Sequence, residues 1–187
     1  KYSSLKYVNI NNPNIPLGSC LIHAIKSVSS HYLITMDGDL SHLAIHLHDF
    51  IDAFSAGHDV VIGGRYKNGQ AAFDPKKRYL ISKIFNRIIK IVYHSSFSDF
   101  TTGYRGFKRD LFSKLKIKSK DFNFHLELNA KLLKMGKNPI EIEIIYRKRT
   151  EGRSKFNYFK LFPKYLQATI ISLRLYFSMI HHKGVKF

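Results

Sequence analysis

The chain has little cysteine, few acidic residues and no long apolar run. Cys20 is the only cysteine among 187 residues, which excludes an intramolecular disulfide framework and a cysteine-rich zinc module. Because no stretch of about eighteen consecutive apolar residues occurs, the sequence predicts no membrane-spanning helix. Only 13 acidic residues oppose 31 lysines and arginines, which gives a formal net charge of +18. Such a surface favours partners that carry phosphate, whether nucleic acid, anionic lipid or nucleotide.

Hydrophobic and aromatic residues, in contrast, are plentiful. At 44% hydrophobic and 14% aromatic composition the chain can bury a sizeable core, which excludes a disordered protein, and its length suits one domain. The chain opens at Lys1 without an initiator methionine and already within a pattern. We therefore expect an N-terminally incomplete chain.

The first half of the chain alternates between strand and helix patterns, which predicts a parallel α/β fold. Strands are expected at residues 5–10, 32–36 and 59–62, and a helix at residues 18–29. A second helix would carry Leu43, Leu47, Phe50 and Phe54 on one face, with Ser41 as its cap.

The second half begins with an amphipathic helix at residues 78–92, followed by a loop at 95–106. A further helix is expected at 124–135, and a half-exposed strand where Ile140, Ile142 and Ile144 alternate with glutamates. Residues 156–180 mix aromatic and aliphatic side chains with lysine and arginine. This pattern is typical of helices that lie at a membrane surface, although helices packed on the core give the same pattern.

The sharpest motif is Asp37-Gly38-Asp39, directly after an apolar strand. Two carboxylates this close repel each other, and a divalent cation would neutralise them. Carboxylate oxygens suit Mg²⁺ or Mn²⁺ bound to a nucleotide diphosphate. The alternatives are a plain polar turn and a phosphatase of the haloacid dehalogenase type, but the latter needs a later acidic pair that this sequence lacks.

Other polar residues follow the same strands. His42 and His46 are spaced one helical turn apart, either as polar-face histidines or, with Asp39, as zinc ligands. Arg65 follows two glycines that permit a ligand to approach the backbone closely.

Two further groups of residues are candidates for phosphate contacts. Arg78 and Ser82 share a helix face and suit one phosphate, or else a solvated surface. Arg149, Ser154 and Lys155 lie in a basic loop that either closes over a phosphorylated substrate or is an ordinary surface loop.

Five segments in this order resemble the dolichyl-phosphate mannose synthase branch of the family 2 glycosyltransferases, over most of the chain. The segments are Tyr32-Leu-Ile-Thr-Met-Asp37-Gly-Asp39-Leu-Ser41-His42, Val60-Val-Ile-Gly-Gly-Arg65-Tyr66, Arg78-x-x-x-Ser82, Asp99-Phe-Thr-Thr-Gly103-Tyr-Arg105-Gly-Phe107 and Arg149-x-x-Gly152-x-Ser154-Lys155.

The resemblance implies a GT-A fold, Rossmann-like with a mostly parallel sheet flanked by helices, and transfer of a hexose from a nucleotide sugar to a polyprenyl phosphate. It implies that Asp39 coordinates Mg²⁺ or Mn²⁺ and that Asp37 lies beside the ion or the diphosphate. Cations and a hydroxyl would line the phosphate-binding region: Arg65, Arg78, Ser82, Arg149, Ser154 and Lys155. The family's first strand and its nucleotide-binding segment are not present before Lys1.

Charge explains why such a site needs no strong general base. A phosphate oxygen of the acceptor is already anionic at pH 7, so the site must instead bring two anions together and stabilise the departing nucleoside diphosphate. A single displacement would invert the sugar carbon. Glu127 is either a base or a helix-face acid.

These expectations divide the chain into a catalytic domain at residues 1–155 and an amphipathic membrane-surface segment at 156–187. The predicted enzyme uses GDP-mannose, or alternatively UDP-glucose, and is peripheral to the cytoplasmic face of a membrane. Other possibilities are a truncated, degenerate transferase that serves as an interaction module, and a basic nucleic-acid-binding protein. The sequence has no nucleic-acid-binding motif, so no nucleic acid partner is expected.

Overall fold

The computed structural model describes residues 15–66, 76–121 and 123–147, together with Leu166, Thr169, Ile170, Leu173 and Arg174; in residues 76–78 only the backbone is described. The expected strand at residues 5–10 and the basic loop that carries Arg149, Ser154 and Lys155 lie outside the described residues, as does most of the 156–187 segment.

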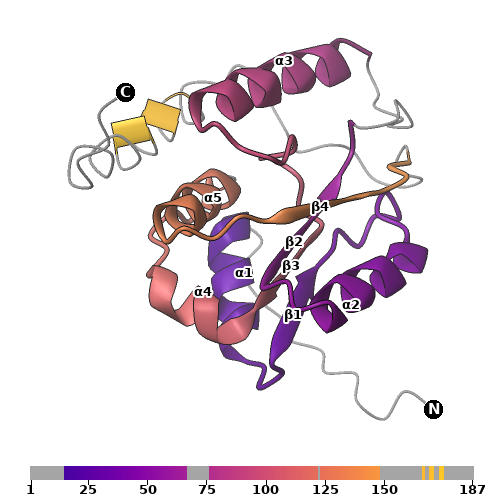
Figure 1. The fold of residues 1–187 in the computed structure, drawn as a ribbon, viewed down its shortest axis with the longest axis vertical. Helices are drawn as coiled ribbons and strands as arrows, with labels where there is room; N and C mark the ends of the chain where they lie inside the picture. The colour runs from indigo at the N-terminus through magenta and orange to yellow at the C-terminus, as the bar shows by residue number, and fades with distance from the viewer. Residues whose placement is uncertain are drawn as a thin grey trace.

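A mixed sheet of four strands forms the centre of the molecule (Figure 1). The strands are β1 (Tyr32–Thr35), β2 (Val60–Gly64), β3 (Arg105–Lys108) and β4 (Ile140–Glu143), in the spatial order β1-β3-β2-β4. β2 pairs with β4 in parallel, whereas β3 is antiparallel to both β1 and β2. β1, β2 and β4 therefore run in one direction, as a mostly parallel sheet requires, and β3 alone runs against them.

β3 falls largely outside the expected elements, because the sequence there reads as a loop up to Gly106. The strand is four residues long and has no alternation of polar and apolar side chains. Its position depends on Gly106, where a Cβ atom would lie 2.5 Å from the ring of Phe54 and 2.8 Å from that of Phe50. The absence of a side chain thus lets the α2 aromatics pack directly on the strand.

Helices cover both faces of the sheet. In chain order they are α1 (Leu17–Lys26), η1 (Ala44–His46), α2 (Leu47–Ser55), α3 (Lys76–Val92), α4 (Arg109–Leu115) and α5 (Phe124–Lys134). α2 lies on one side of the sheet, and α1, α4 and α5 lie on the other (Figure 1). The seven-residue α4 was not expected from the sequence, since it is too short to show a clear helical period.

The expected cap at Ser41 is wrong. A 3₁₀ turn intervenes, so that α2 begins at Leu47 after His46, and the buried Ser41 binds Asp39 instead.

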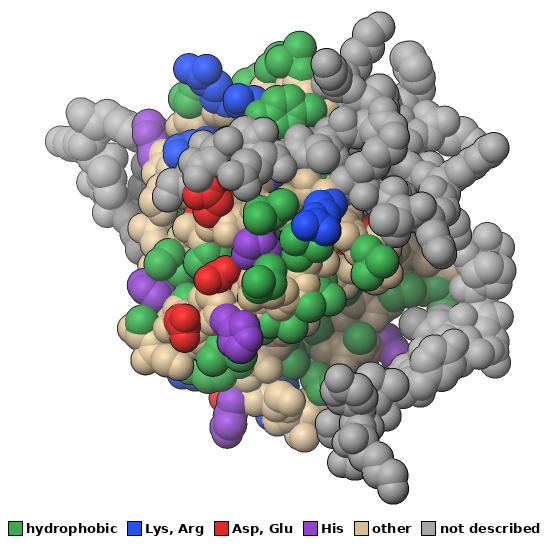
Figure 2. Space-filling view, turned by 90° about the vertical axis from the view of Figure 1, so that its right-hand side faces the viewer, with side chains coloured by type: hydrophobic (Ala, Val, Ile, Leu, Met, Phe, Trp, Pro, Cys, Tyr) green, Lys and Arg blue, Asp and Glu red, His purple; other side chains and the backbone are tan. Residues whose placement is uncertain are grey.

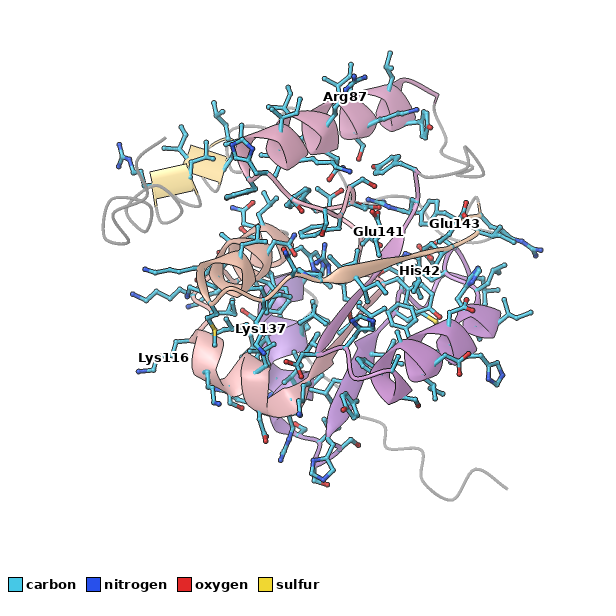
Figure 3. All side chains as sticks on the ribbon, in the orientation of Figure 1. His42, Arg87, Lys116, Lys137, Glu141 and Glu143 are labelled. Atoms are coloured by element: carbon cyan, nitrogen blue, oxygen red, sulfur yellow. The ribbon has the colours of Figure 1, made fainter. Side chains whose placement is uncertain are left out.

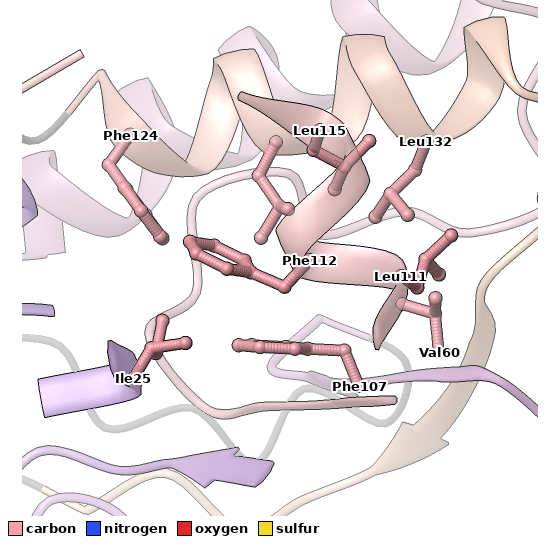
Figure 4. Packing of buried hydrophobic residues seen from close by; sticks show 9 residues of the cluster. Ile25, Val60, Phe107, Leu111, Phe112, Leu115, Phe124 and Leu132 are labelled. Carbon is pink, nitrogen blue, oxygen red and sulfur yellow. The ribbon is translucent and has the colours of Figure 1, made fainter. Parts of the chain in front are cut away.

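Three clusters of buried side chains make the core. On the α1 side, Phe107 and Val60 of the sheet pack against α4 and α5 (Figure 4). On the other face, Phe50 and Phe54 of α2 pack with Val61, Tyr104 and Ile144. The third cluster joins Ile62 to Ile89 of α3, Phe97 and Phe100, and to Leu126 and Ala130 of α5; Leu173 of the C-terminal segment packs against it. None of the described helices is both long enough and apolar enough to cross a lipid bilayer.

Candidate functional site

Asp37 and Asp39 lie just beyond the carboxyl end of β1, as expected. The preceding Thr35 anchors the strand end, because its hydroxyl donates to the carbonyl of Gly103 at 2.7 Å. The Asp37 side chain is 44% exposed and extends across Gly103, where a Cβ atom would lie 3.2 Å from its Oδ1. A larger residue at position 103 would therefore crowd the carboxylate.

Asp39 is oriented within its own turn. Its Oδ1 accepts the backbone N–H of Ser41 at 3.1 Å and the Ser41 hydroxyl at 2.5 Å. Leu40 between them has φ of 62°, in the left-handed region that non-glycine residues rarely adopt. The turn thus keeps the Asp39 carboxylate in one place at the cost of a strained leucine.

The turn that contains Asp37 is also held by His42, whose Nδ1 accepts the backbone N–H of Asp37 at 3.0 Å. The imidazole is buried, with its ring stacked on Tyr104 and edge-on to Tyr146. Burial lowers the pKa of His42 to about 4, while Asp37 acts to raise it and Arg65 to lower it. His42 is therefore neutral at pH 7 and lies among the charges of both the carboxylate pair and Arg65.

The sequence offered two interpretations of His42, a solvated helix face and a zinc ligand. The structure supports neither, because the His42 side chain is buried and belongs to no metal cluster of the described residues. Among the described residues no group of three or more histidine, cysteine, aspartate or glutamate side chains is placed to hold a metal ion. The face that carries α2 shows acidic and histidine side chains scattered among hydrophobic ones (Figure 2).

Arg65 leaves the end of β2 and forms a buried ion pair with Asp99. Its Nε and Nη2 donate to the two Asp99 oxygens at 2.6 and 2.9 Å, and Nη2 also donates to Thr101 Oγ1 at 2.8 Å. Burial disfavours both charges, yet each group favours ionisation of the other. The pKa of Asp99 is consequently lowered and that of Arg65 is raised. The Asp99 carboxylate thus neutralises much of the positive charge of Arg65, the residue that the family resemblance places in the phosphate-binding region.

Tyr146 links Arg65 back to His42. The Arg65 guanidinium carbon lies 5.4 Å from the centre of the Tyr146 ring, and that ring meets the His42 ring edge-on at 5.4 Å. A continuous chain of contacts therefore runs from Asp37 through His42 and Tyr146 to Arg65. Because β1 and β2 run in one direction, Asp37 and Arg65 both follow the carboxyl ends of strands, at the same edge of the sheet.

Ser82 and Arg78 come from α3. The Ser82 hydroxyl lies 2.5 Å from that of Tyr66, and burial raises the pKa of Tyr66 to about 12, so the phenol stays neutral. The amide of Asn86 donates to Tyr66, to Thr101 and to the Ser82 carbonyl, which ties α3 to the Arg65 region. Arg78 belongs to the first turns of α3, and its side chain is outside the description.

The loop between Asp99 and Arg105 is a buried polar scaffold; the sequence marked this segment as part of the family resemblance but assigned none of its residues a role. Arg105, which is fully buried, donates to the carbonyls of Thr102 and Asp99 and to Asn129 Oδ1. Burial, reinforced by the charge of Arg65, lowers the pKa of Arg105 to about 10. The one signal in the sequence is the short Asp99–Arg105 spacing, because burial and the contact with the distant Arg65 appear only in the structure.

Glu127 has a structural role. Its carboxylate accepts the backbone N–H groups of Lys118 and Ser119 and pairs with Lys131 at 2.6 Å. Burial opposes ionisation, but these donors overcome it and leave the pKa of Glu127 lowered. A carboxylate held by three donors is a poor base, and its contacts are with the loop before α5.

The donor set at Asp37 and Asp39 fits a divalent cation such as Mg²⁺ or Mn²⁺. Both ions prefer oxygen ligands, and Mg²⁺ is usually bound by one or two carboxylates together with waters and substrate phosphates rather than by an all-protein cage. The partly exposed Asp37 carboxylate, beside an Asp39 held by its turn, meets that requirement without a third acidic residue.

Sequence comparisons find relatives among glycosyltransferases. The family model described as glycosyl transferase family 2 matches residues 1–116. The chain is 31% identical over 129 residues to polyprenol monophosphomannose synthase of Mycolicibacterium smegmatis, covering 67% of this chain and 49% of the relative. It is 29% identical over 129 residues to undecaprenyl-phosphate mannosyltransferase of Micrococcus luteus, covering 67% and 53%. The chain therefore spans about half the length of these curated relatives.

Solved structures share the fold. Glucosyl-3-phosphoglycerate synthase from Mycobacterium tuberculosis in complex with phosphoglyceric acid superposes with a TM-score of 0.66 at 10% identity, covering 89% of this chain and 57% of that one. The same enzyme with Mn²⁺ and UDP-glucose gives a TM-score of 0.61 at 12% identity, covering 89% and 56%. These likenesses confirm the expected GT-A type of fold.

Proposed function

Because the chain belongs to glycosyl transferase family 2, we propose that it transfers a hexose from a nucleotide sugar to a polyprenyl phosphate, as part of a longer protein or alone. The observation that carries this proposal is the convergence of the Asp37–Asp39 turn and Arg65 on one buried histidine, His42. Two relatives whose names specify polyprenol and undecaprenyl-phosphate mannosyl products support the acceptor class.

For the donor we propose GDP-mannose, with UDP-glucose as the alternative. Mannose follows from the names of the two relatives, which are about 30% identical to this chain. UDP-glucose occurs in structures that share only the fold at 10–12% identity, so it carries less weight. A competition between the two donors distinguishes these possibilities.

In the proposed mechanism, Asp39 and Asp37 would hold Mg²⁺ or Mn²⁺ at the end of β1. The ion supplies Lewis-acid stabilisation of the negative charge that develops on the departing diphosphate. The strained turn and the Ser41 hydroxyl keep Asp39 oriented, and the acceptor phosphate attacks without a general base because its oxygen is already anionic. One displacement inverts the anomeric carbon.

Arg65, Arg78 and Ser82 are proposed to bind the phosphates of donor and acceptor. Ser82 and Arg65 share Tyr66 as a neighbour, which brings the hydroxyl and the guanidinium to the same side of α3. Since Asp99 already pairs with Arg65, this arginine is better suited to holding the site's shape and supplying a partial positive field than to a strong ion pair with substrate. Arg149, Ser154 and Lys155 remain proposed phosphate ligands on the strength of the sequence motif alone.

We propose that α3 rests on an anionic membrane surface at the cytoplasmic face, where a polyprenyl acceptor resides. Its apolar residues Leu80, Ile81, Ile84, Ile88 and Ile91 are between 49% and 64% exposed. The helix has no acidic residue, and its basic residues include Lys83, Arg87 and Lys90. The side chain of Arg87 extends from α3 in Figure 3. A helix with these properties suits the interface between lipid head groups and acyl chains.

A vesicle flotation experiment tests the surface. The full chain should bind vesicles of phosphatidylcholine with phosphatidylglycerol more strongly than vesicles of phosphatidylcholine alone. The double variant Ile84→Gln/Ile88→Gln should lose this binding, whereas Ile51→Gln, an equally exposed isoleucine on α2, should retain it. Equal vesicle binding by both variants would show that α3 is not the membrane-binding surface.

Transfer itself is tested with radiolabelled GDP-mannose and UDP-glucose, a polyprenyl phosphate and Mn²⁺ or Mg²⁺. We expect a labelled lipid product with GDP-mannose that requires the divalent ion. No product from either donor, in a preparation that contains the complete natural protein, would overturn the proposed function.

A further inference from the structure

Two histidines near the proposed site each accept a hydrogen bond from a backbone N–H, but they do so with different ring nitrogens. The Nδ1 of His42 accepts the backbone N–H of Asp37 at 3.0 Å, and the Nε2 of His46 accepts the backbone N–H of Ile145 at 2.9 Å. Each histidine thus satisfies a backbone N–H that lies outside the strand pairing, and so ties its own segment to that point of the chain. Both bonds require an unprotonated nitrogen that accepts.

His42 is held rigidly. Its side chain, labelled in Figure 3, is 1% exposed. Its ring stacks on Tyr104 at 4.9 Å and meets Tyr146 edge-on. With Nδ1 as acceptor, the ring proton must be on Nε2, so the tautomer is determined by the bond to Asp37. The carboxylate of Asp37 lies 3.8 Å from the same Nδ1. The position of this ring therefore sets the direction in which Asp37 leaves the strand.

His46 is oriented from its other side. Its Nδ1 lies 3.0 Å from Oδ2 of Asp49 in the first turn of α2, which leaves Nε2 to accept from Ile145. Asp49 can only accept a hydrogen bond when it is ionised, so this contact places the ring proton of His46 on Nδ1.

The backbone joins the same two segments. The N–H of Arg147 donates to the carbonyl of Ser41 at 3.0 Å, and His42 and Tyr146 form an isolated antiparallel bridge. Together with the His46–Ile145 bond, these contacts connect the segment from Ser41 to His46 with each of the three residues from Ile145 to Arg147.

We propose that His42 and His46 are positioning residues that hold the Asp37 turn and the chain after β4 as one rigid wall of the transferase site. This inference rests on the proposed function for its effect on catalysis, but the geometric part stands on its own. Loss of either bond should loosen the wall and weaken binding of the divalent ion by roughly 10- to 100-fold, the range seen when the support of a metal ligand is removed.

The opposite nitrogens provide a matched test. Asparagine places an amide oxygen near the position of a histidine Nδ1, and glutamine places one near Nε2. We therefore expect His42→Asn to preserve the hydrogen bond and His42→Gln to lose it, with the reverse order at position 46. A role limited to filling space would not produce this crossed pattern.

The first measurement is hydrogen exchange of the Asp37 and Ile145 amides in the full chain. Exchange at Asp37 should accelerate at least tenfold in His42→Gln and stay near wild type in His42→Asn. Exchange at Ile145 should accelerate in His46→Asn and stay protected in His46→Gln. Should both variants of the buried His42 unfold, the half-buried His46 pair decides the question by itself.

The second measurement is the Mn²⁺ concentration that gives half-maximal sugar transfer, which should rise in the two variants that lose the bond while maximal rate changes less. Equal exchange rates for the asparagine and glutamine variants at each position would overturn the proposal. If the wild-type protein transfers no sugar while the four variants show the crossed exchange pattern, the proposed function is refuted but the positioning role of the two histidines stands.

Discussion

Two groups of charged residues, one exposed and one buried, lie at the same side of the sheet. The Asp37 side chain is 44% exposed, whereas Asp99 is fully buried against Arg65. The exposed carboxylate of Asp37 is accessible to an ion, whereas the buried carboxylate of Asp99 is already paired with Arg65. Residue type alone therefore does not distinguish a ligand from a support; solvent exposure does.

The largest effect is expected from removing the buried charge. Asp99→Asn leaves the Arg65 guanidinium buried without its counter-charge, which should lower the free energy of unfolding by about 3–5 kcal/mol. Urea denaturation measures the change. The matched change Asp37→Asn, at an exposed position, should alter stability by less than about 0.5 kcal/mol. Similar losses for both variants would abolish the distinction between the two groups.

Asp39→Asn tests the exposed group in the opposite way. Its amide oxygen can still accept from Ser41, so the fold should be retained, but a neutral ligand binds a divalent ion poorly. We expect sugar transfer to fall by roughly 100-fold or more, a loss of several kcal/mol in transition-state stabilisation. Full activity in this variant, measured with saturating Mn²⁺, would reject Asp39 as a metal ligand.

Acid should destabilise the buried region. Burial, followed by the charge of Arg105, lowers the pKa of His125 well below its ordinary 6.5. Below pH 6.5, His125 is protonated in the unfolded chain but stays neutral in the folded chain. The contribution of His125 to the free energy of unfolding is therefore fully present above this pH and decreases as the pH falls. One such proton contributes at most about 1.4 kcal/mol per pH unit.

Urea denaturation at several pH values between 7.5 and 4.5 gives the free energy of unfolding as a function of pH. This free energy should fall less steeply with decreasing pH for His125→Leu than for the wild type. Part of the slope should remain, because burial also lowers the pKa of His42, to about 4. An unchanged slope would mean that His125 already accepts a proton in the folded protein.

The smallest effect is expected where the two regions meet. Tyr66→Phe removes one hydroxyl that contacts Ser82 and Asn86, and should cost about 1 kcal/mol of stability. If Ser82 also binds a phosphate, its freed hydroxyl should change the apparent KM for the polyprenyl phosphate more than the maximal rate. A shift in thermal midpoint without any change in KM would assign Ser82 to the scaffold alone.

Several elements could be predicted because their signal is local. α5 and β2 match the expected segments within two residues, since their apolar residues recur at the spacing of a helix or run together as in a buried strand. The position of Asp37 and Asp39 at a strand end followed equally from the apolar run before them.

The missed elements depend on contacts distant in sequence. β3 is a strand because Gly106 allows the Phe54 ring of α2 to approach it and because β1 and β2 both offer it partners. The role of Glu127 likewise depended on the amides of Lys118 and Ser119, which no helical spacing reveals.

The amino-acid sequence by itself determined the family, the alternation of helices and strands, and the two carboxylates at the end of β1, since all of these reside in short contiguous patterns. Only the tertiary structure decided which charges stay in water and which become internal supports. Arg65 and Arg105 look alike in the sequence. Burial acts to lower the pKa of both, but the Asp99 carboxylate raises the pKa of Arg65 despite it, whereas burial, reinforced by the charge of Arg65, lowers that of Arg105. Burial and the distance between charges determine such differences, and both arise only when remote segments pack together.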